Sequence, residues 1–331
     1  MMRAPGIVGL SCLALAAAVL FGVAFGTEPV SLARALSDAS SLDRVIVVDV
    51  RLPRVLLGAI SGAGLSIVGV SLQALLRNPL AEPYVLGVSG GSAVGATVAI
   101  LLGVSGLSAF GASIVPIFAL AGGIGATALV HLLAESAPDS RGTSILLAGV
   151  VVNAMAAAGI TFVKTLVTQS KAQELLFWLT GFLDVPSRAS LVAMAVYVTI
   201  GTAVLLRDAA RLNILALGDA AAEHLGISVR GVERRTYLAS ALIVGAIVSV
   251  TGLIGFVGLL VPHALRKVVG PDARRLMPAS LGFGGAALVL CDLVSRSAFR
   301  LLHREPPVGA VTALIGGTLF LLLLRRSPHR G

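Results

Sequence analysis

Long apolar runs follow one another along the whole chain and are separated by short polar stretches. A helix needs about 20 apolar residues to cross the roughly 30 Å hydrocarbon layer of a membrane, and most of these runs reach that length. The eighth run is shorter and contains Pro262. The pattern predicts ten spanning helices, at residues 7–25, 52–76, 87–103, 110–134, 144–167, 189–206, 237–257, 258–267, 277–301 and 308–324. The predicted fold class is therefore all-α, a polytopic membrane protein with a single transmembrane domain over residues 1–331.

One polar stretch, residues 77–83, is chemically unsuited to hydrocarbon because it carries charge and two prolines. Pro79 and Pro83 lack a backbone N–H, and each biases the preceding residue away from helix. Irregular backbone at membrane depth is tolerated only where it is buried in protein or lines a water-filled cavity. The stretch therefore predicts part of a path through the membrane, or else an ordinary cytoplasmic turn between two helices.

A second break is predicted in the other half of the chain, where residues 255–266 contain Pro262 and lead into the charged stretch 270–275. Paired breaks in two halves of a membrane protein indicate internal repeats around a central site. His263, at this second break, suits a ligand or a proton carrier. It has no acid or second histidine at ligand spacing, so it more often satisfies a carbonyl, and no metal site is predicted.

Composition and charge agree with a membrane protein, since 56% of the 331 residues are hydrophobic and 12% are charged. The net charge of +9 comes from short basic clusters at the predicted helix ends, which indicates positive-inside topology and a lipid bilayer rather than nucleic acid. The bias places both termini in the cytoplasm. Cys12 and Cys291 lie inside apolar runs and carry no disulfide or metal signal. Arg3 followed by the run 7–25 resembles a secretory signal, but the length of the run favours a retained first helix.

Two further polar stretches each allow two interpretations. Residues 164–187 contain Trp178, the only tryptophan, and fit a short amphipathic helix at the outer interface that acts as an anchor or as a gate. Residues 217–227 predict a short helix that ends at Gly226, with Asp219 near its N-terminus where the helix dipole favours a carboxylate. This elbow is either a docking surface for a partner or a solvated loop.

Several motifs lie beside these breaks and at the outer helix ends. They are Arg51-Leu52-Pro53-Arg54, Gln73 with Arg77-Asn78-Pro79-Leu80-Ala81-Glu82-Pro83, Leu86-Gly87, Gly255-Phe256-Val257-Gly258-Leu259 with Pro262-His263 and Arg266, and Glu305 with Pro307-Val308-Gly309. Together they resemble the permease subunits of type II ABC importers that carry iron-siderophore complexes, haem or cobalamin. The resemblance covers roughly residues 51–324, and the outer loop with Pro306 and the basic stretch 300–304 departs from the commoner form of the family.

The resemblance implies an assembly as well as a fold. A homodimer of ten-helix subunits would surround one translocation path in a bacterial inner membrane, with two ATP-binding subunits below and a periplasmic substrate-binding protein above. ATP and Mg²⁺ would bind to the ATP-binding subunits, and this chain would bind no cofactor. In agreement, Gly90-Gly91-Ser92 lacks the lysine of a nucleotide-binding P-loop.

The resemblance also assigns roles to three groups of residues. An inner gate would comprise Asn78, Leu80, Thr143 and Ser144. A coupling elbow at about residues 218–230 would contact the ATPase through Gly218, Asp219, Glu223, His224, Leu225 and Gly226. The binding protein would dock on Arg51, Arg54 and Arg296.

The function expected from these features is import by alternating access, without covalent chemistry in this chain. No nucleophile with a base, paired carboxylates or metal cluster is recognisable, which argues against an intramembrane enzyme. The alternative is an ion-coupled secondary transporter, which normally carries acids in mid-membrane, whereas only Asp292 lies inside an apolar run here and near its outer part.

The cargo is predicted from the charge of the outer mouth. Its basic residues are Lys164, Lys171, Arg188, Arg300 and Arg304. Positive charge suits haem or a ferric siderophore better than cobalamin, so haem is the preferred cargo. The same charge would equally serve the docking protein.

Overall fold

The computed structural model describes residues 4–104, 108–109, 112–135 and 141–325. Its elements are α1 (Ala4–Ala24), α2 (Leu32–Ser37), α3 (Leu42–Val45), the π-helix η1 (Ile46–Arg51), α4 (Leu52–Leu75), the 3-10 helix η2 (Pro83–Leu86), α5 (Val88–Leu101), β1 (Ser108–Ala109), β2 (Ala112–Ser113), α6 (Val115–Glu135), α7 (Arg141–Leu166), α8 (Gln169–Thr180), α9 (Arg188–Leu215), α10 (Asp219–His224), α11 (Val229–Thr251), α12 (Val257–Val269), α13 (Ala273–Leu302) and α14 (Val308–Arg325). The two strands form only a two-residue antiparallel hairpin, so the fold is helical as predicted.

Each of the ten predicted spans contains a helix, in the order α1, α4, α5, α6, α7, α9, α11, α12, α13 and α14. Within the described residues, six helical stretches are long and apolar enough to cross a membrane: Gly6–Ala24, Leu42–Leu75, Val115–Ala134, Ser144–Leu166, Arg188–Leu215 and Ala273–Leu302. Two apolar helices, Val88–Leu101 and Val308–Leu322, are shorter. The fold is that of a multi-pass membrane protein.

Several helix boundaries differ from the predicted ones, and α11 begins at Val229 rather than residue 237. Helix α9 continues to Leu215 rather than residue 206, because Leu212 and Leu215 remain buried after the chain turns polar at Arg207. Helix α11 ends at Thr251 rather than residue 257, because Gly252 takes a positive φ of 67° that ends the helix. Pro262 lies inside α12, so the second break is upstream of the proline that predicted it.

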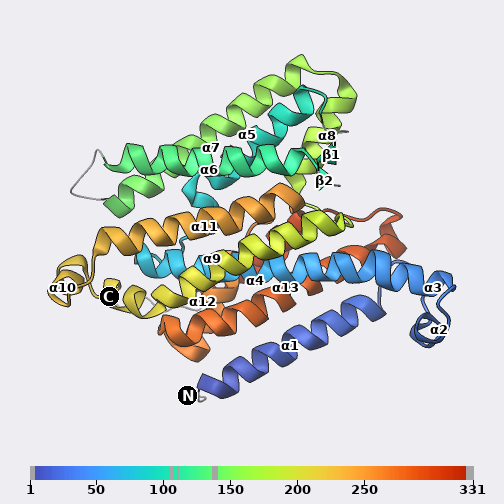
Figure 1. Cartoon of the computed structure of the whole chain (residues 1–331), viewed down its shortest axis with the longest axis horizontal. Coiled ribbons are helices and arrows are strands. Elements are labelled where there is room, and N and C mark those ends of the chain that lie inside the picture. Colours follow the sequence, from blue (N-terminus) through green and yellow to red (C-terminus); the bar gives the residue numbers. More distant parts are fainter. Residues whose placement is uncertain (1–3, 105–107, 110–111, 136–140, 326–331) are drawn as a thin grey trace.

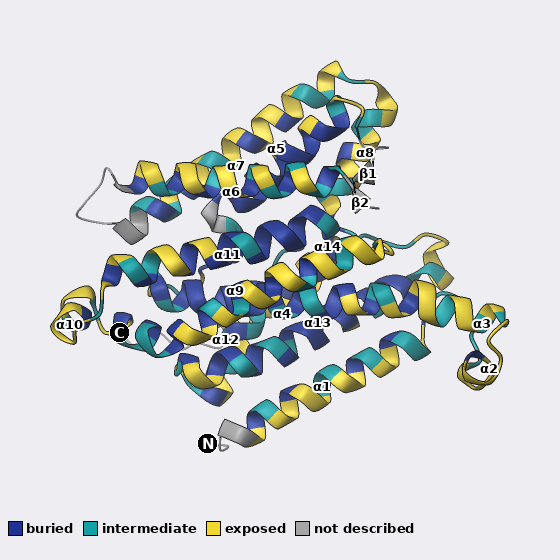
Figure 2. Ribbon diagram, viewed as in Figure 1, coloured by how far each residue is buried: buried dark blue, intermediate teal, exposed yellow. Residues whose placement is uncertain are grey.

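Helix α4 lies at the centre of the bundle and contacts α9, α11, α12 and α13 (Figure 1). In the most apolar 18-residue segment of Leu42–Leu75, 83% of the residues are buried inside the protein (Figure 2). The corresponding share in α7 is 22%. Close approach of α4 and α13 depends on glycine, since a Cβ on Gly62 would lie 2.2 Å from the carbonyl oxygen of Gly284. Small residues serve this purpose in membrane proteins because burial in lipid supplies no hydrophobic drive.

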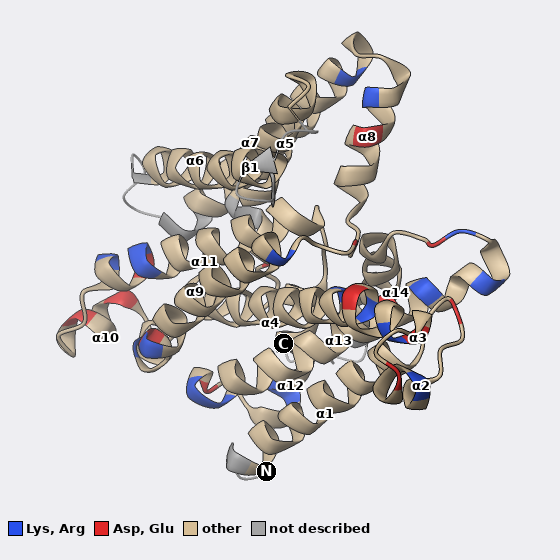
Figure 3. Ribbon diagram, turned by 45° about the vertical axis from the view of Figure 1, so that its right-hand side comes forward, with Lys and Arg blue, Asp and Glu red and all other residues tan. Residues whose placement is uncertain are grey.

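Helices α5, α6 and α7 pack on one another and form a layer along one side of the bundle (Figure 1). The layer joins the rest mainly through contacts of α6 and α5 with α11. Charged residues gather at the two ends of the bundle and are scarce between them (Figure 3). Helix α10 lies at one end, and α2 and α3 lie at the other (Figure 1).

The predicted amphipathic helix is α8, which begins after Thr168 and ends at Gly181. Its tryptophan, Trp178, is half-buried and packs against the hydrophobic core. The carbonyl oxygen of Trp178 also lies against Gly252. A Cβ added to Gly252 would be only 2.1 Å from that oxygen. Helix α8 is therefore packed onto the end of α11.

Candidate functional site

The two helix breaks, far apart in sequence, meet in the folded chain. The first follows α4 and includes η2, and the second is the segment from Gly252 to Phe256 between α11 and α12. The Tyr84 hydroxyl donates to the Ile254 carbonyl over 2.7 Å and accepts from the Ile254 N–H over 2.8 Å. The Glu82 carboxylate accepts from the Phe256 N–H at 2.8 Å. Two side chains of the first break thus satisfy backbone groups that the second break leaves outside any helix.

The second break is held in a conformation that ordinary residues avoid. Phe256 has a positive φ of 68°, in the left-handed region that is unfavourable for a bulky side chain. Immediately after it, Gly258 packs so tightly that a Cβ would lie 2.4 Å from Cγ of Pro83. The carbonyl oxygen of Gly258 lies against Gly69 of α4, where a Cβ would be only 1.7 Å away. This is the carbonyl that Pro262, four residues on, cannot bond.

Glu82 is a half-buried carboxylate at the contact between the breaks. Burial raises the pKa of Glu82 above its ordinary value, and the hydrogen bond from the Phe256 N–H opposes part of that rise. The carboxylate is therefore sensitive to acid at the point where the two breaks touch.

Gln73 connects α4, the first break and α12. Its side chain is 2% exposed, and its Nε2 donates to the carbonyls of Ala81 and Leu259, each at 3.4 Å. Its Oε1 accepts from Nη2 of Arg266 at 2.9 Å. Both residues belong to motifs singled out in the sequence, and the structure brings them together.

Helix α7 is attached to the first break by Asn153. The Asn153 Nδ2 donates to the Tyr84 carbonyl at 2.8 Å, and its Oδ1 accepts from the Gly90 N–H at 3.0 Å. Neither Asn153 nor Tyr84 was predicted as a site residue. The available signals were an isolated asparagine in the apolar run 144–167 and a tyrosine between the motif that ends at Pro83 and the motif Leu86-Gly87.

The residues predicted as an inner gate lie at the first break and at the start of α7. Asn78 Oδ1 accepts from the Leu80 N–H at 2.9 Å, which closes a local turn and leaves Leu80 46% exposed. Thr143 and Ser144 are in the first turn of α7, and the side chain of Thr143 lies outside the described residues. Helix α7 contacts η2 through Asn153, nine residues beyond Ser144, so the role of Thr143 and Ser144 in a gate stays a prediction.

The predicted elbow contains the short helix α10, with Gly218 before it and Gly226, at a positive φ of 74°, after it. Asp219 is in its first turn, as the sequence predicts. The Arg77 guanidinium forms an ion pair with Asp219, and its Nε donates to the Leu215 carbonyl at 3.0 Å. The elbow is thereby joined directly to the start of the first break.

The arginines predicted to dock a binding protein lie at the end of the bundle opposite α10, but they point into the protein. Arg51 is 4% exposed and Arg296 is 3% exposed. Arg51 Nη1 donates to the carbonyls of Val23 and Ala24, each at 3.0 Å, and Arg296 Nη1 donates to Gly22 at 3.1 Å. Both guanidinium groups therefore fix the end of α1, and docking stays a prediction.

Arg54 is the most accessible of the three arginines, with 14% of its side chain exposed. It pairs with Asp292 at 2.9 Å and with Glu305 at 2.9 Å, and Asp292 also lies 2.8 Å from Arg296. Asp292 is 1% exposed, so this is a buried ion network across α4, α13 and the loop before α14.

A helical bundle with interlocked breaks, an external elbow and no catalytic group identified in its sequence has the architecture of a transport permease. Residues 13–326 match the model of the FecCD transport family, and the chain belongs to that family. It is the permease subunit of a type II ABC importer.

Named relatives carry different cargoes. The chain is 42% identical over 284 residues to the cobalamin import system permease protein BtuC of Halobacterium salinarum, covering 85% of this chain and 74% of the relative. It is 34% identical over 302 residues to the hemin transport system permease protein HmuU of Yersinia pestis, covering 90% and 89%. A metal-chelate type ABC transporter solved in an inward-facing conformation superposes with a TM-score of 0.87 at 30% identity, over 98% of this chain and 100% of that one.

Proposed function

We propose that two copies of this chain surround one path across a bacterial inner membrane and import a metal chelate by alternating access. Two separate ATP-binding subunits, which hold ATP and Mg²⁺, supply the energy, and a periplasmic binding protein delivers the cargo. Both chain termini, and the elbow with α10, lie on the cytoplasmic side. This proposal is supported by the family assignment together with the geometry of the breaks.

The observation that carries the proposal is the connection from elbow to break. Arg77 pairs with Asp219 on α10, and seven residues later Tyr84 bonds Ile254 of the second break. A displacement of α10 by an ATP-binding subunit would therefore be transmitted to both breaks through short, directional bonds. Interfaces of this kind rearrange between discrete packings rather than deform continuously.

The surface of the elbow suits a protein partner. Leu217 is 76% exposed and Leu225 is 64% exposed, one on each side of α10. Exposed apolar side chains within a polar surround are typical of protein contact sites. In this proposal they contact the ATP-binding subunit, together with Glu223 and His224.

Ion-coupled transport is the less favourable mechanism because the buried carboxylates are already neutralised. Among the described residues, Asp208 and Asp292 are the buried acids. Asp208 pairs with Arg211 and Arg235, and Asp292 pairs with Arg54 and Arg296. A carboxylate that binds and releases a coupling ion would have to leave two guanidinium groups in each case.

For the cargo, cobalamin is now preferred to haem. The charge argument for haem loses part of its support because Arg188 pairs with Asp49. A neighbouring carboxylate offsets part of the positive potential at the mouth. The 42% identity to a cobalamin permease favours the same choice.

The decisive experiment is uptake by proteoliposomes that contain this chain, its ATP-binding subunit and the loaded binding protein. We expect cobalamin to accumulate only with ATP and Mg²⁺, and haem to accumulate more slowly. Uptake that persists without the ATP-binding subunit, driven by an ion gradient, would overturn the ABC mechanism. Faster uptake of haem would overturn the cargo assignment alone.

The gate assignment has a separate test. The single variants Asn78→Cys and Leu80→Cys, placed in the assembled transporter, should react with a water-soluble thiol reagent in one nucleotide state and be protected in another. Gly159→Cys is the comparison, because a side chain added at this position of α7 meets no other atom within 4 Å. Its reactivity should be the same in every nucleotide state. Protection of both gate positions in every nucleotide state would exclude them from an aqueous path.

A further inference from the structure

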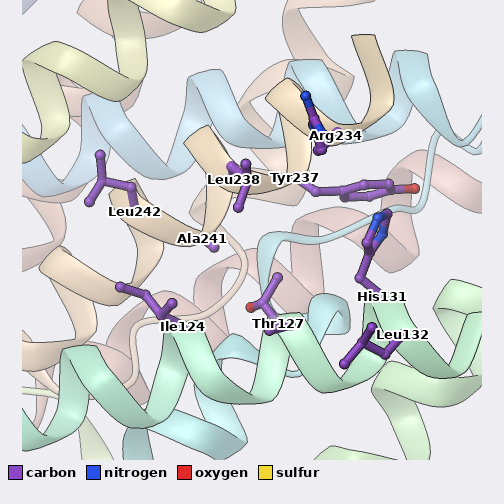
Figure 4. Close-up of a pocket in the computed structure, with 10 residues that line it drawn as sticks. Ile124, Thr127, His131, Leu132, Arg234, Tyr237, Leu238, Ala241 and Leu242 are labelled. Atoms are coloured by element: carbon purple, nitrogen blue, oxygen red, sulfur yellow. The ribbon is translucent and has the colours of Figure 1, made fainter. Parts of the chain in front are cut away.

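A groove on the outside of the bundle, between α6 and α11, has no part in the site formed by the two breaks. Its cavity volume is about 480 Å³, within the range of small-molecule sites. Figure 4 shows that the lining runs from Ile124 and Leu242 at one end to His131, Tyr237 and Arg234 at the other. None of its lining residues belongs to either helix break.

The body of the groove is apolar and open to the surroundings of the protein. Leu132 on α6 and Leu238 on α11 both line it, and they are 63% and 60% exposed. In a membrane-spanning chain such side chains meet lipid acyl chains. An apolar groove of this kind is complementary in shape to a single acyl chain, whereas a helix surface without a groove offers no such site.

One end of the groove is polar and positively charged. Arg234 is exposed and makes no ion pair with any acid among the described residues. Nearby in the sequence, Arg235 and Arg211 both pair with Asp208, so that acid does not offset Arg234. An exposed guanidinium beside an apolar groove is complementary to a lipid phosphate and its acyl chain.

Two aromatic rings lie beside Arg234 at this end of the groove (Figure 4). The rings of His131 and Tyr237 lie 6.0 Å apart, one from each helix, between the apolar body of the groove and the arginine. Tyr237 is 4% exposed, so its ring forms the wall of the groove. The order along the groove is therefore apolar side chains, aromatic rings and a cation, which is complementary to the acyl chain and phosphate of a phospholipid.

We propose that this groove binds one anionic phospholipid of the cytoplasmic leaflet, with an acyl chain between α6 and α11 and the phosphate on Arg234. The inference rests on the cytoplasmic placement of α10 in the proposed function, but not on import or on the cargo. A lipid bound here bridges the layer of α5, α6 and α7 to α11, whose other end leads into the second break.

The test is lipid retention by the full-length chain, measured by native mass spectrometry after addition of dioleoyl phosphatidylglycerol or dioleoyl phosphatidylcholine. Since a basic residue near an anionic surface strengthens lipid binding by a factor of about five, phosphatidylglycerol should be retained about fivefold better. Arg234→Gln should bring the two lipids close to parity. Arg207→Gln, an exposed arginine of α9 outside this groove, is the matched control and should keep the wild-type ratio.

A second variant tests the groove without changing its charge. Ala128 is exposed in the groove wall, so Ala128→Phe fills the space while leaving the helix packing and Arg234 in place. It should abolish the preference for phosphatidylglycerol. Wild-type retention in Ala128→Phe would overturn the proposal, as would an equal loss of preference in Arg207→Gln and Arg234→Gln.

The position of the lipid can be mapped with phosphatidylglycerol that carries a photoreactive acyl chain, in the assembled transporter and without ATP or cargo. The expected cross-links are to α6 and α11 at the groove. Labelling spread evenly over the helices would overturn the proposal. So would labelling of the groove only in the isolated chain, since a second copy or another protein would then occupy it in the assembly.

Discussion

The two ends of the central helix α4 are held in opposite ways. At its first end, Arg54 joins Asp292, Glu305 and, through Asp292, Arg296 in a buried ion network. At its last end, the connections are hydrogen bonds to backbone groups and the half-exposed pair of Arg77 with Asp219. Breaking a buried ion pair leaves an uncompensated charge, whereas an exposed pair is screened by water. From this comparison we expect the end with the ion network to stay fixed and the end with the breaks to move during transport.

The largest effect is expected from Asp292→Ala at the fixed end. Removing this carboxylate leaves Arg54 and Arg296 buried without it, and loss of one partner of a buried pair destabilises by about 3–5 kcal/mol. The measurement is the free energy of unfolding in mixed detergent micelles. Arg188→Gln breaks the exposed pair with Asp49 and should change it by only about 0–1 kcal/mol. Similar small losses in both variants would show that the network does not lock this end.

A smaller effect is expected from Tyr84→Phe at the contact of the two breaks. The variant leaves the N–H and carbonyl of Ile254 without their partner, a loss of about 1–3 kcal/mol for buried groups. ATP-driven uptake should fall more than stability, because the second break loses its connection to the first. Tyr197→Phe, on the surface of α9, is the matched control and should leave both measurements unchanged. Wild-type uptake in Tyr84→Phe would remove this contact from the mechanism.

The next prediction concerns the pH dependence of stability through Glu82. Because its folded-state pKa lies above the ordinary value of 4.5, this group favours folding at acidic pH. That contribution is complete below the unfolded pKa and is lost as the pH rises through the folded one. Glu82→Gln still accepts from the Phe256 N–H but does not titrate, so its thermal stability should vary less between acidic and neutral pH. Glu174→Gln, exposed on α8, should keep the wild-type profile, and an unchanged slope in Glu82→Gln would contradict the assignment.

The smallest change in stability, at about 0–1 kcal/mol, is expected from Arg77→Gln, since its ion pair with Asp219 is half-exposed. Uptake should nevertheless decrease several-fold while ATP hydrolysis continues, because the elbow is no longer tied to the first break. Arg207→Gln, exposed on α9 and outside the elbow, provides the comparison and should leave uptake unchanged. Loss of hydrolysis and uptake in the same proportion would place Arg77 in assembly of the complex rather than in coupling.

Much of the fold could be predicted because hydrocarbon imposes a simple rule on sequence. A spanning helix requires a long apolar run, so the helices that cross the bundle are recognisable as runs in the sequence itself. The ends of α9 and α11 were misplaced, since they depend on whether Leu212 and Leu215 find a buried surface and on the conformation of Gly252. Those are properties of neighbours that come from elsewhere in the chain.

The candidate site was predicted only in outline. Pro79 and Pro83 located the first break correctly, because a missing N–H acts on the local backbone. Pro262 suggested the second break several residues too late, since Gly258 and Gly69 approach closely enough to keep α12 helical around the proline. The arginines at 51 and 296 were expected at the surface, and they are buried because the carbonyls at the end of α1 accept from them.

The sequence by itself determined that this chain spans a membrane many times and that its backbone is interrupted by the polar stretch 77–83. Apolar length and the chemistry of proline are local properties, and they need no partner to act. Only the tertiary structure decided that the two helix breaks bind each other, through Tyr84 and Glu82, and that Arg77 joins them to α10. These contacts connect residues more than 140 positions apart, and such pairings are fixed by how the helices pack rather than by any pattern along the chain.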